Sequence, residues 1–186
     1  MINQQSPQPA GPEPSPASAS APFTIRPQLD ADIAAIVAFS LRAWKPVFAS
    51  MAHVLGPRLN RLVYPDWAAA QARAVEEVCR DETMTVWVAE AGARPVGFVA
   101  VAFRTDPDSA EIEMIAVDPD QQNRGIGSAL LACAFGQISA AGVKLVQLGT
   151  GGDPGHAPAR HTYEKAGFTA LPLVRYYKEL PAVRED

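Results

Sequence analysis

Short stretches of apolar residues, several of them alternating with polar ones, predict five β-strands along the chain. The stretches are 23–27, 84–89, 96–103, 110–117 and 144–148. A turn at 91–94 joins the second and third stretches into a β-hairpin. A further extended stretch at 168–178 is typical of an edge strand, because Pro172 removes a backbone donor that an inner strand needs.

Apolar residues spaced three and four positions apart predict helices between these strands. The first helix follows Asp30, a suitable N-cap, and residues 45–82 continue as mostly helical chain that is broken at its prolines. Two later helices are predicted over 124–140 and 157–166. This order of elements predicts a mixed α/β domain whose sheet has an antiparallel central meander.

Composition divides the chain into two parts. Residues 1–22 hold six of the 17 prolines among Ser and Ala, which predicts a flexible tail before one domain over 23–186. The net charge of −4 lacks the basic footprint of a nucleic-acid binder. The chain has no run of about 18 apolar residues, so the sequence predicts no membrane-spanning helix. The start also lacks the parts of a secretion signal, and two cysteines are too few for a disulfide framework, so we expect a cytoplasmic protein.

The most informative segment, 115–129, passes from a strand through a loop into a helix. Gly125 and Gly127 stand at the helix start, where unpaired N–H groups and the positive end of the helix dipole favour a phosphate or pyrophosphate. A dinucleotide fingerprint would need glycine in place of Leu130, and a P-loop would need lysine in place of Ser128. Neither of these two templates fits.

Gln122–Gly127 instead resembles the Gln/Arg-x-x-Gly-x-Gly/Ala motif of the GCN5-related N-acetyltransferases (the GNAT family). The strand before it, Ile115–Pro119, and the late segment Ala159–Phe168 are also similar to that family's motifs. The resemblance covers about 23–180. It implies a GNAT-like α/β fold with flanking helices and a strand–loop–helix pyrophosphate site. It also implies acetyl-CoA as cosubstrate and acetyl transfer to a primary amine.

The resemblance assigns roles to particular residues. Glu113 is the first candidate for the general base and Glu111 the second, acting directly or through a water; an ion pair with Arg104 is the alternative role for both. In a regular strand they would share a face with Ile115 and Val117. The residues implied in cofactor binding are Ile115, Ala116, Val117, Gln122, Asn123, Arg124, Gly125, Ile126, Gly127, Ser128 and His156.

Tyr163 matches the family's general acid, with core packing against Phe168 as the alternative. The backbone N–H of Ala116 or Val117 is the expected oxyanion donor. His156 stands near the place where the family often has an Asn that contacts the pantetheine arm.

The sequence says less about where the amine acceptor binds. Aromatic side chains that could line it are Trp44, Phe48, Tyr64, Trp67, Tyr176 and Tyr177. We expect a small-molecule or peptide amine as acceptor, a homodimer by analogy, and no nucleic-acid, membrane or metal partner; the histidines lack ligand spacing. The alternative function is a non-catalytic acyl-CoA-binding or regulatory module on the same fold.

Overall fold

The computed structural model describes residues 22–105 and 108–181. Its core is a five-stranded sheet in the order β1-β2-β3-β4-β5. The strands are β1 (Thr24–Pro27), β2 (Met84–Ala91), β3 (Arg94–Thr105), β4 (Asp108–Val117) and β5 (Val146–Gln147). The first four pair antiparallel, and β5 pairs parallel to β4. The mixed α/β class and the antiparallel meander predicted from the sequence are confirmed.

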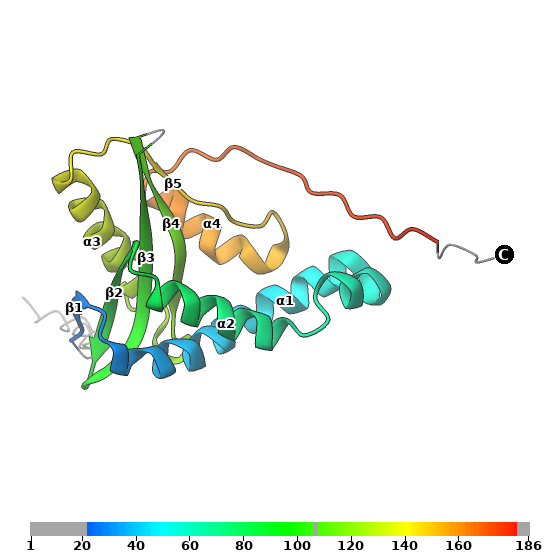
Figure 1. The fold of residues 1–186 in the computed structure, drawn as a ribbon, viewed down its shortest axis with the longest axis horizontal. Coiled ribbons are helices and arrows are strands. Elements are labelled where there is room, and N and C mark those ends of the chain that lie inside the picture. The colour runs from blue at the N-terminus through cyan, green and yellow to red at the C-terminus, as the bar shows by residue number, and fades with distance from the viewer. Residues whose placement is uncertain (1–21, 106–107, 182–186) are drawn as a thin grey trace, which may run out of the picture.

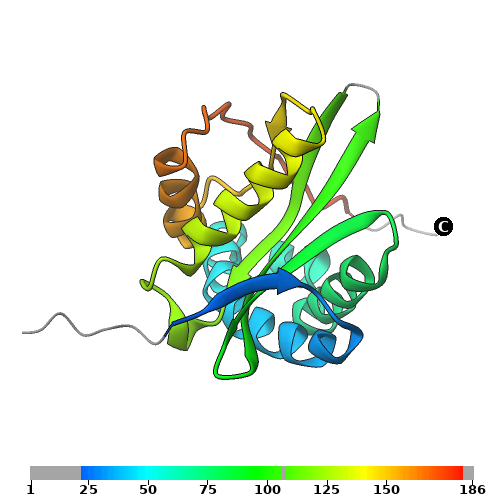
Figure 2. The same cartoon turned by 90° about the vertical axis from the view of Figure 1, so that its left-hand side faces the viewer.

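Helices cover both faces of the sheet (Figures 1 and 2). One face carries α1 (Ile33–Val63) and α2 (Trp67–Arg80), and the other carries α3 (Ile126–Ala140), with α4 (Ala157–Lys165) beside β4 and β5. Three short 3₁₀ helices join them: η1 (Asp30–Asp32), η2 (Pro119–Gln121) and η3 (Pro154–His156). Because η1 precedes α1, the helix begins at Ile33 and Asp30 is not its N-cap.

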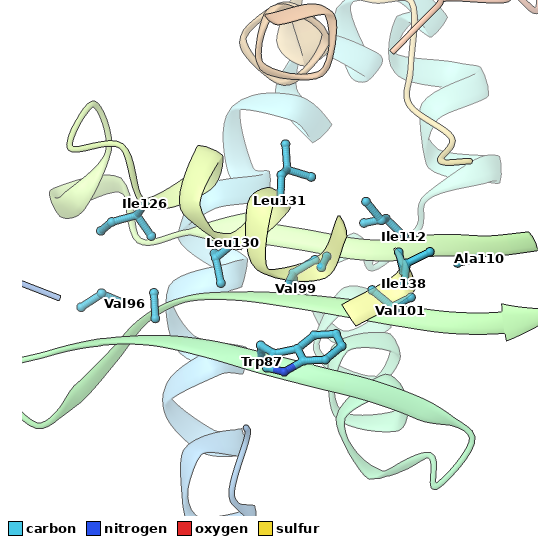
Figure 3. Close-up of a cluster of buried hydrophobic side chains, with 12 residues drawn as sticks. Trp87, Val96, Val99, Val101, Ala110, Ile112, Ile126, Leu130, Leu131 and Ile138 are labelled. Carbon is cyan, nitrogen blue, oxygen red and sulfur yellow. The ribbon is translucent and has the colours of Figure 1, made fainter. Parts of the chain in front are cut away.

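Alternate residues of the strands fill two separate cores. Between the sheet and α3, Trp87, Val99 and Ile112 pack against Leu130 and other α3 side chains (Figure 3). On the other face, Phe98 packs with residues of α1 and α2 in the second cluster. Full burial of each large apolar side chain contributes roughly 1.5–3 kcal/mol, so the sheet is held from both sides.

Helix α1 is bent. It contains two prolines, and at Gly56 the backbone has a φ of 73°, outside the helical region. The sequence-based exclusion of a membrane-spanning helix was too strict, since α1 together with η1 is long and apolar enough for a span by length and composition. In this structure, however, Ile36 and Phe39 of α1 are buried against the sheet, as in a core helix.

The structure departs from the predicted elements near the C-terminus. The extended stretch 168–178 forms no strand, and β5 has only two residues rather than the five predicted. The predicted tail, apart from Pro22, lies outside the described residues.

Candidate functional site

Strand β4 is irregular where the site begins. Ala100 of β3 pairs with Met114, but the next residue, Val101, pairs with Ile112, so Glu113 is the extra residue of a β-bulge. On its other side β4 pairs with β5 only at Ala110 and Glu111. From the bulge onward, β4 therefore has a free edge where a parallel neighbour would otherwise continue.

The register fixes which backbone groups occupy that free edge. The Asp118 N–H donates to the Val96 carbonyl at 2.8 Å, and hydrogen-bonded pairs alternate along an antiparallel ladder. Ala116 is therefore directed toward Phe98 of β3, whereas Ile115 and Val117 direct their N–H and C=O groups away from β3. Of the two oxyanion donors expected, the register leaves Val117 facing the free edge.

The loop after β4 ends in a cluster of unpaired backbone donors. Asn123 and Gly125 have φ values of 61° and 80°, and Gly125 is the N-cap of α3 without a side-chain cap. Along the described chain, the backbone N–H groups of residues 123–128 donate no hydrogen bond. Six free donors at the positive end of a 15-residue helix fit a pyrophosphate.

Side chains of the loop hold this shape. Gln122 donates from Nε2 to the Val117 carbonyl at 3.3 Å, and Arg124 donates from Nη1 to Gln121 Oε1 at 2.9 Å. Sequence reasoning missed a contact from outside the loop: Arg42 of α1 donates to Asp118 and Asp120, at 2.7 Å each. No local signal pairs Arg42 with residues 76 and 78 positions later, because the fold alone brings them together.

The two candidate bases share one partner. Arg104 Nη2 donates to Glu111 Oε2 at 3.0 Å and to Glu113 Oε1 at 2.5 Å. Ala110 and Ile112 face α3, so Glu111 lies on the α1 face of the sheet, and the bulge brings Glu113 to the same arginine. In a regular strand both glutamates would share a face with Ile115 and Val117, but a bulge intervenes and shifts the alternation.

Tyr163 is partly buried against the α3 core. Its ring contacts Phe168 edge-on at 6.0 Å between centroids, and both pack against the α3 cluster. Burial raises the pKa of Tyr163 above its ordinary value of about 10. The phenol therefore stays protonated at neutral pH, as a proton donor must.

His156 has a partner that the sequence analysis did not name. Its Nδ1 hydrogen-bonds Asp153 Oδ1, and Asp153 Oδ2 also accepts the Gly155 N–H at 3.0 Å. Burial acts to raise the pKa of Asp153, but hydrogen bonds from Ser50 and His156 outweigh it, so the pKa lies below its ordinary value. The sequence signal for this contact was the aspartate directly before Pro154, since Asp often caps a helical turn.

Three of the predicted acceptor-side aromatics come together where α1 meets α2. Phe48 lies 4.6 Å from Trp67 and 5.4 Å from Tyr64, between ring centroids. Tyr177 hydrogen-bonds Tyr64. The other two lie elsewhere: Trp44 packs on the second core, and Tyr176 is 89% exposed.

Neither cysteine has the environment of a nucleophile. Burial raises the pKa of Cys79 to about 11 and also raises that of Cys133. Within the described residues, no group of three His, Cys, Asp or Glu side chains is placed to hold a metal ion.

Free N–H groups at a helix start lie beside a strand that parts from its parallel neighbour, an arrangement that fits a phosphate-bearing ligand on a mixed α/β fold. A sequence profile described as the acetyltransferase (GNAT) family matches residues 52–168, more than half of the chain. The chain therefore belongs to the GNAT family of acetyltransferases.

Comparison with known proteins agrees with this assignment. Over 121 residues the chain is 31% identical to a mycothiol acetyltransferase of Clavibacter michiganensis, covering 55% of this chain and 38% of that protein. This chain thus spans about two fifths of that relative's length.

Two solved structures with CoA share the fold. The PaiA N-acetyltransferase of Thermoplasma acidophilum has a TM-score of 0.61 at 16% identity, covering 81% of this chain and 91% of that one. An aminoglycoside N-acetyltransferase has a TM-score of 0.58 at 17% identity, covering 88% and 98%.

Proposed function

We propose that this protein transfers an acetyl group from acetyl-CoA to a primary amine. The observation that carries the proposal is the row of six free backbone N–H groups at residues 123–128, next to the free edge of β4. The loop would hold the pyrophosphate, and Ile115 and Val117 would hydrogen-bond the chain that leads to the thioester. When bound, acetyl-CoA supplies the activated acetyl group.

The remaining chemistry falls to side chains near that edge. An amine with a pKa near 10.4 is protonated at pH 7 and must lose a proton before it attacks. Glu113, in the bulge, is our first candidate to take a proton from the attacking nitrogen, directly or through a water, and Glu111 is the second. The Val117 N–H would stabilise charge on the carbonyl oxygen, and Tyr163 would protonate the departing thiolate.

Arg104 limits how the glutamates can act. One nitrogen of its guanidinium contacts a single oxygen of each carboxylate, so each glutamate keeps its second oxygen free of this arginine. Arg104 would thereby orient Glu113 without blocking it.

The small acceptor we propose is cationic, in keeping with the chain's 20 acidic against 16 basic residues. A cytoplasmic location stays a prediction from the sequence.

The test is thiol release from acetyl-CoA in the presence of a panel of primary amines. Release that requires both protein and amine supports the enzyme. CoA binding without release across amino acids, polyamines, aminoglycosides and peptide N-termini would favour the non-catalytic acyl-CoA module instead. Preference for NAD or ATP over CoA in competition binding would contradict both.

We further propose that a second copy of this chain is a partner, through residues 169–181. Four apolar side chains there are 72–85% exposed: Leu171, Leu173, Val174 and Leu180. The segment runs outward from the sheet to the far end of α1 (Figure 1), where Arg58 donates to Glu179 at 2.8 Å. So much contiguous exposed apolar surface marks an association site. Sedimentation of the wild-type protein should show a dimer, and the double variant Leu171→Glu, Leu173→Glu should be monomeric. A wild-type monomer at 100 μM (on the order of ten times a typical working concentration) would contradict the proposed dimer.

A further inference from the structure

The loop between β5 and α4 holds an aspartate–histidine pair that the scheme above does not use. The His156 and Asp153 side chains are 18% and 11% exposed, and Nδ1 of the imidazole is bound to the carboxylate. The other ring nitrogen, Nε2, has no hydrogen bond to any described residue. A histidine held in this way presents Nε2 as its proton acceptor, since the carboxylate fixes the tautomer.

Contacts from two helices keep this loop in place. Ser50 of α1 accepts the Gly155 N–H at 2.9 Å, and a Cβ added at Gly155 would lie 2.9 Å from Val47 Cα. From α4, Arg160 Nη1 donates to the carbonyls of Gly151 and Asp153, at 2.6 and 2.9 Å. The imidazole is therefore held by a rigid frame rather than by a mobile loop.

The pair lies against α1 and at the start of α4. Helix α4 runs from its N-terminus beside α1, where η3 packs, toward the sheet (Figure 1). His156 is the N-cap of α4 and Tyr163 lies seven residues later, about 10 Å along the helix axis. The Tyr163 ring packs on the α3 cluster at the sheet end of α4, and His156 lies at the end next to α1. On α1, Ser50 lies about 12 Å beyond Arg42, which contacts the phosphate loop.

Amide formation removes two protons from the attacking nitrogen, and Glu113, which keeps one oxygen free of Arg104, accounts for one of them. We propose that His156 Nε2 accepts a proton from the ammonium group of the acceptor, with Asp153 as its positioning residue. This inference rests on the proposed acetyl transfer. The ammonium gives one proton to His156; the neutral amine then forms the C–N bond as the C–S bond breaks. Its second proton passes to the thiolate by way of Glu113 and Tyr163, and His156 returns its proton to solvent.

Other charged and titratable groups surround the pair. Arg160 faces the loop from α4. Tyr64, at the end of α1, interacts with Asp153 and hydrogen-bonds Tyr177, which in turn hydrogen-bonds Arg175. None of these side chains hydrogen-bonds Nε2 within the described residues, so that nitrogen is left to accept a proton.

The experiment measures kcat/KM for His156→Gln from pH 6.5 to 10 with the best amine of the panel. His161→Gln is the matched control, because His161 is an exposed histidine of α4, the helix that follows His156. We expect a loss of about 100-fold at pH 7 that shrinks to within about threefold near pH 10, where the amine is already neutral. CoA affinity should not change, and imidazole should partly restore a His156→Ala variant.

The other outcomes overturn the role of His156. A deficit that stays constant with pH would be structural, and weakened CoA binding would mean that His156 contacts the pantetheine arm. A deficit that shrinks with pH in Glu113→Gln and not in His156→Gln would assign the proton to Glu113 alone. If the wild-type protein releases no thiol with any amine, both the proposed function and the role of His156 are wrong. If the wild type releases thiol and His156→Gln is equally active, only the role of His156 is wrong.

Discussion

Arg42 Nη2 lies 2.7 Å from Asp118 Oδ2, and this contact joins the middle of α1 to the end of β4 where the phosphate loop begins. Arg42 also reaches Asp120 within η2, so one side chain spans the two acidic residues of the loop. The contact fixes the loop from the acceptor side of the sheet. It thereby links the proposed cosubstrate site to the helix that also holds Ser50 and the His156 loop.

Arg42→Gln should weaken CoA binding modestly. The arginine is half exposed, and exposed ion pairs contribute about 0–1 kcal/mol, so we expect a two- to fivefold rise in the CoA dissociation constant. Calorimetric titration measures it. Arg94→Gln removes a charge of the same sign from the exposed first residue of β3 and should leave the constant unchanged. Equal effects of both variants would mean that only net charge matters.

Gly125→Ala tests the loop conformation. With φ at 80°, a side chain at Gly125 is strained by about 1–2 kcal/mol although its Cβ meets no atom within 4 Å, so the backbone that presents the free N–H groups would shift. CoA affinity should fall at least tenfold in a binding titration.

Gly136→Ala, within the same helix, is the matched control. A Cβ there meets no atom within 4 Å, so the change should raise the free energy of unfolding by about 0.5–1 kcal/mol and leave CoA affinity unaltered. Normal CoA binding by Gly125→Ala would argue against the loop as the pyrophosphate site.

Tyr163→Phe should lower kcat by about 10- to 1000-fold while CoA affinity stays the same. The direction with pH follows from burial, which raises the pKa of Tyr163. The acid is protonated below that pKa, so wild-type activity should not fall from this group until the pH exceeds about 10. The variant should lack that alkaline limb. Unchanged turnover would leave Tyr163 as a core side chain packed against Phe168.

Asp32→Asn tests an ion-pair network far from the site. The Asp32 side chain is 8% exposed, and Arg26 donates to it at 2.7 and 3.0 Å. Removing a buried charged partner should cost about 1–3 kcal/mol of the free energy of unfolding at pH 7, measured with urea.

The pH dependence of that cost has a definite sign. The hydrogen bond from Arg26 holds the pKa of Asp32 below its ordinary value. Its stabilisation is therefore complete above about pH 4 and is lost as the pH falls through the lowered pKa. The gap between wild type and Asp32→Asn should narrow at pH 3. The exposed Asp30→Asn control should show little gap at either pH.

The sequence predicted what depends on local pattern. Alternation and helical spacing located β2, β3, β4 and the helix after Gly125, because each reflects which side chains face a core. The C-terminal stretch shows the limit: Leu171 and Leu173 alternate with polar or turn residues as in a strand, but a strand also needs a neighbour, and none is supplied within this chain's described fold.

The details of the site depended on register. Glu111 and Glu113 both contact Arg104 because β4 has one extra residue relative to β3. The sequence of either strand alone does not show this bulge. The Asp153–His156 contact was similarly hidden, because a three-residue spacing brings side chains together only in a helical turn. The GNAT motif itself could be recognised in the sequence, since its Gly125 is required by the local backbone geometry.

The central claim is that the backbone amides of residues 123–128 bind the pyrophosphate of CoA. Titration of ¹⁵N-labelled protein with CoA, followed by amide chemical shifts, tests this most directly. We predict that the largest shifts fall on Asn123–Ser128 and on Ile115 and Val117, and that NAD does not reproduce them. CoA binding that leaves these amides unshifted would contradict the account.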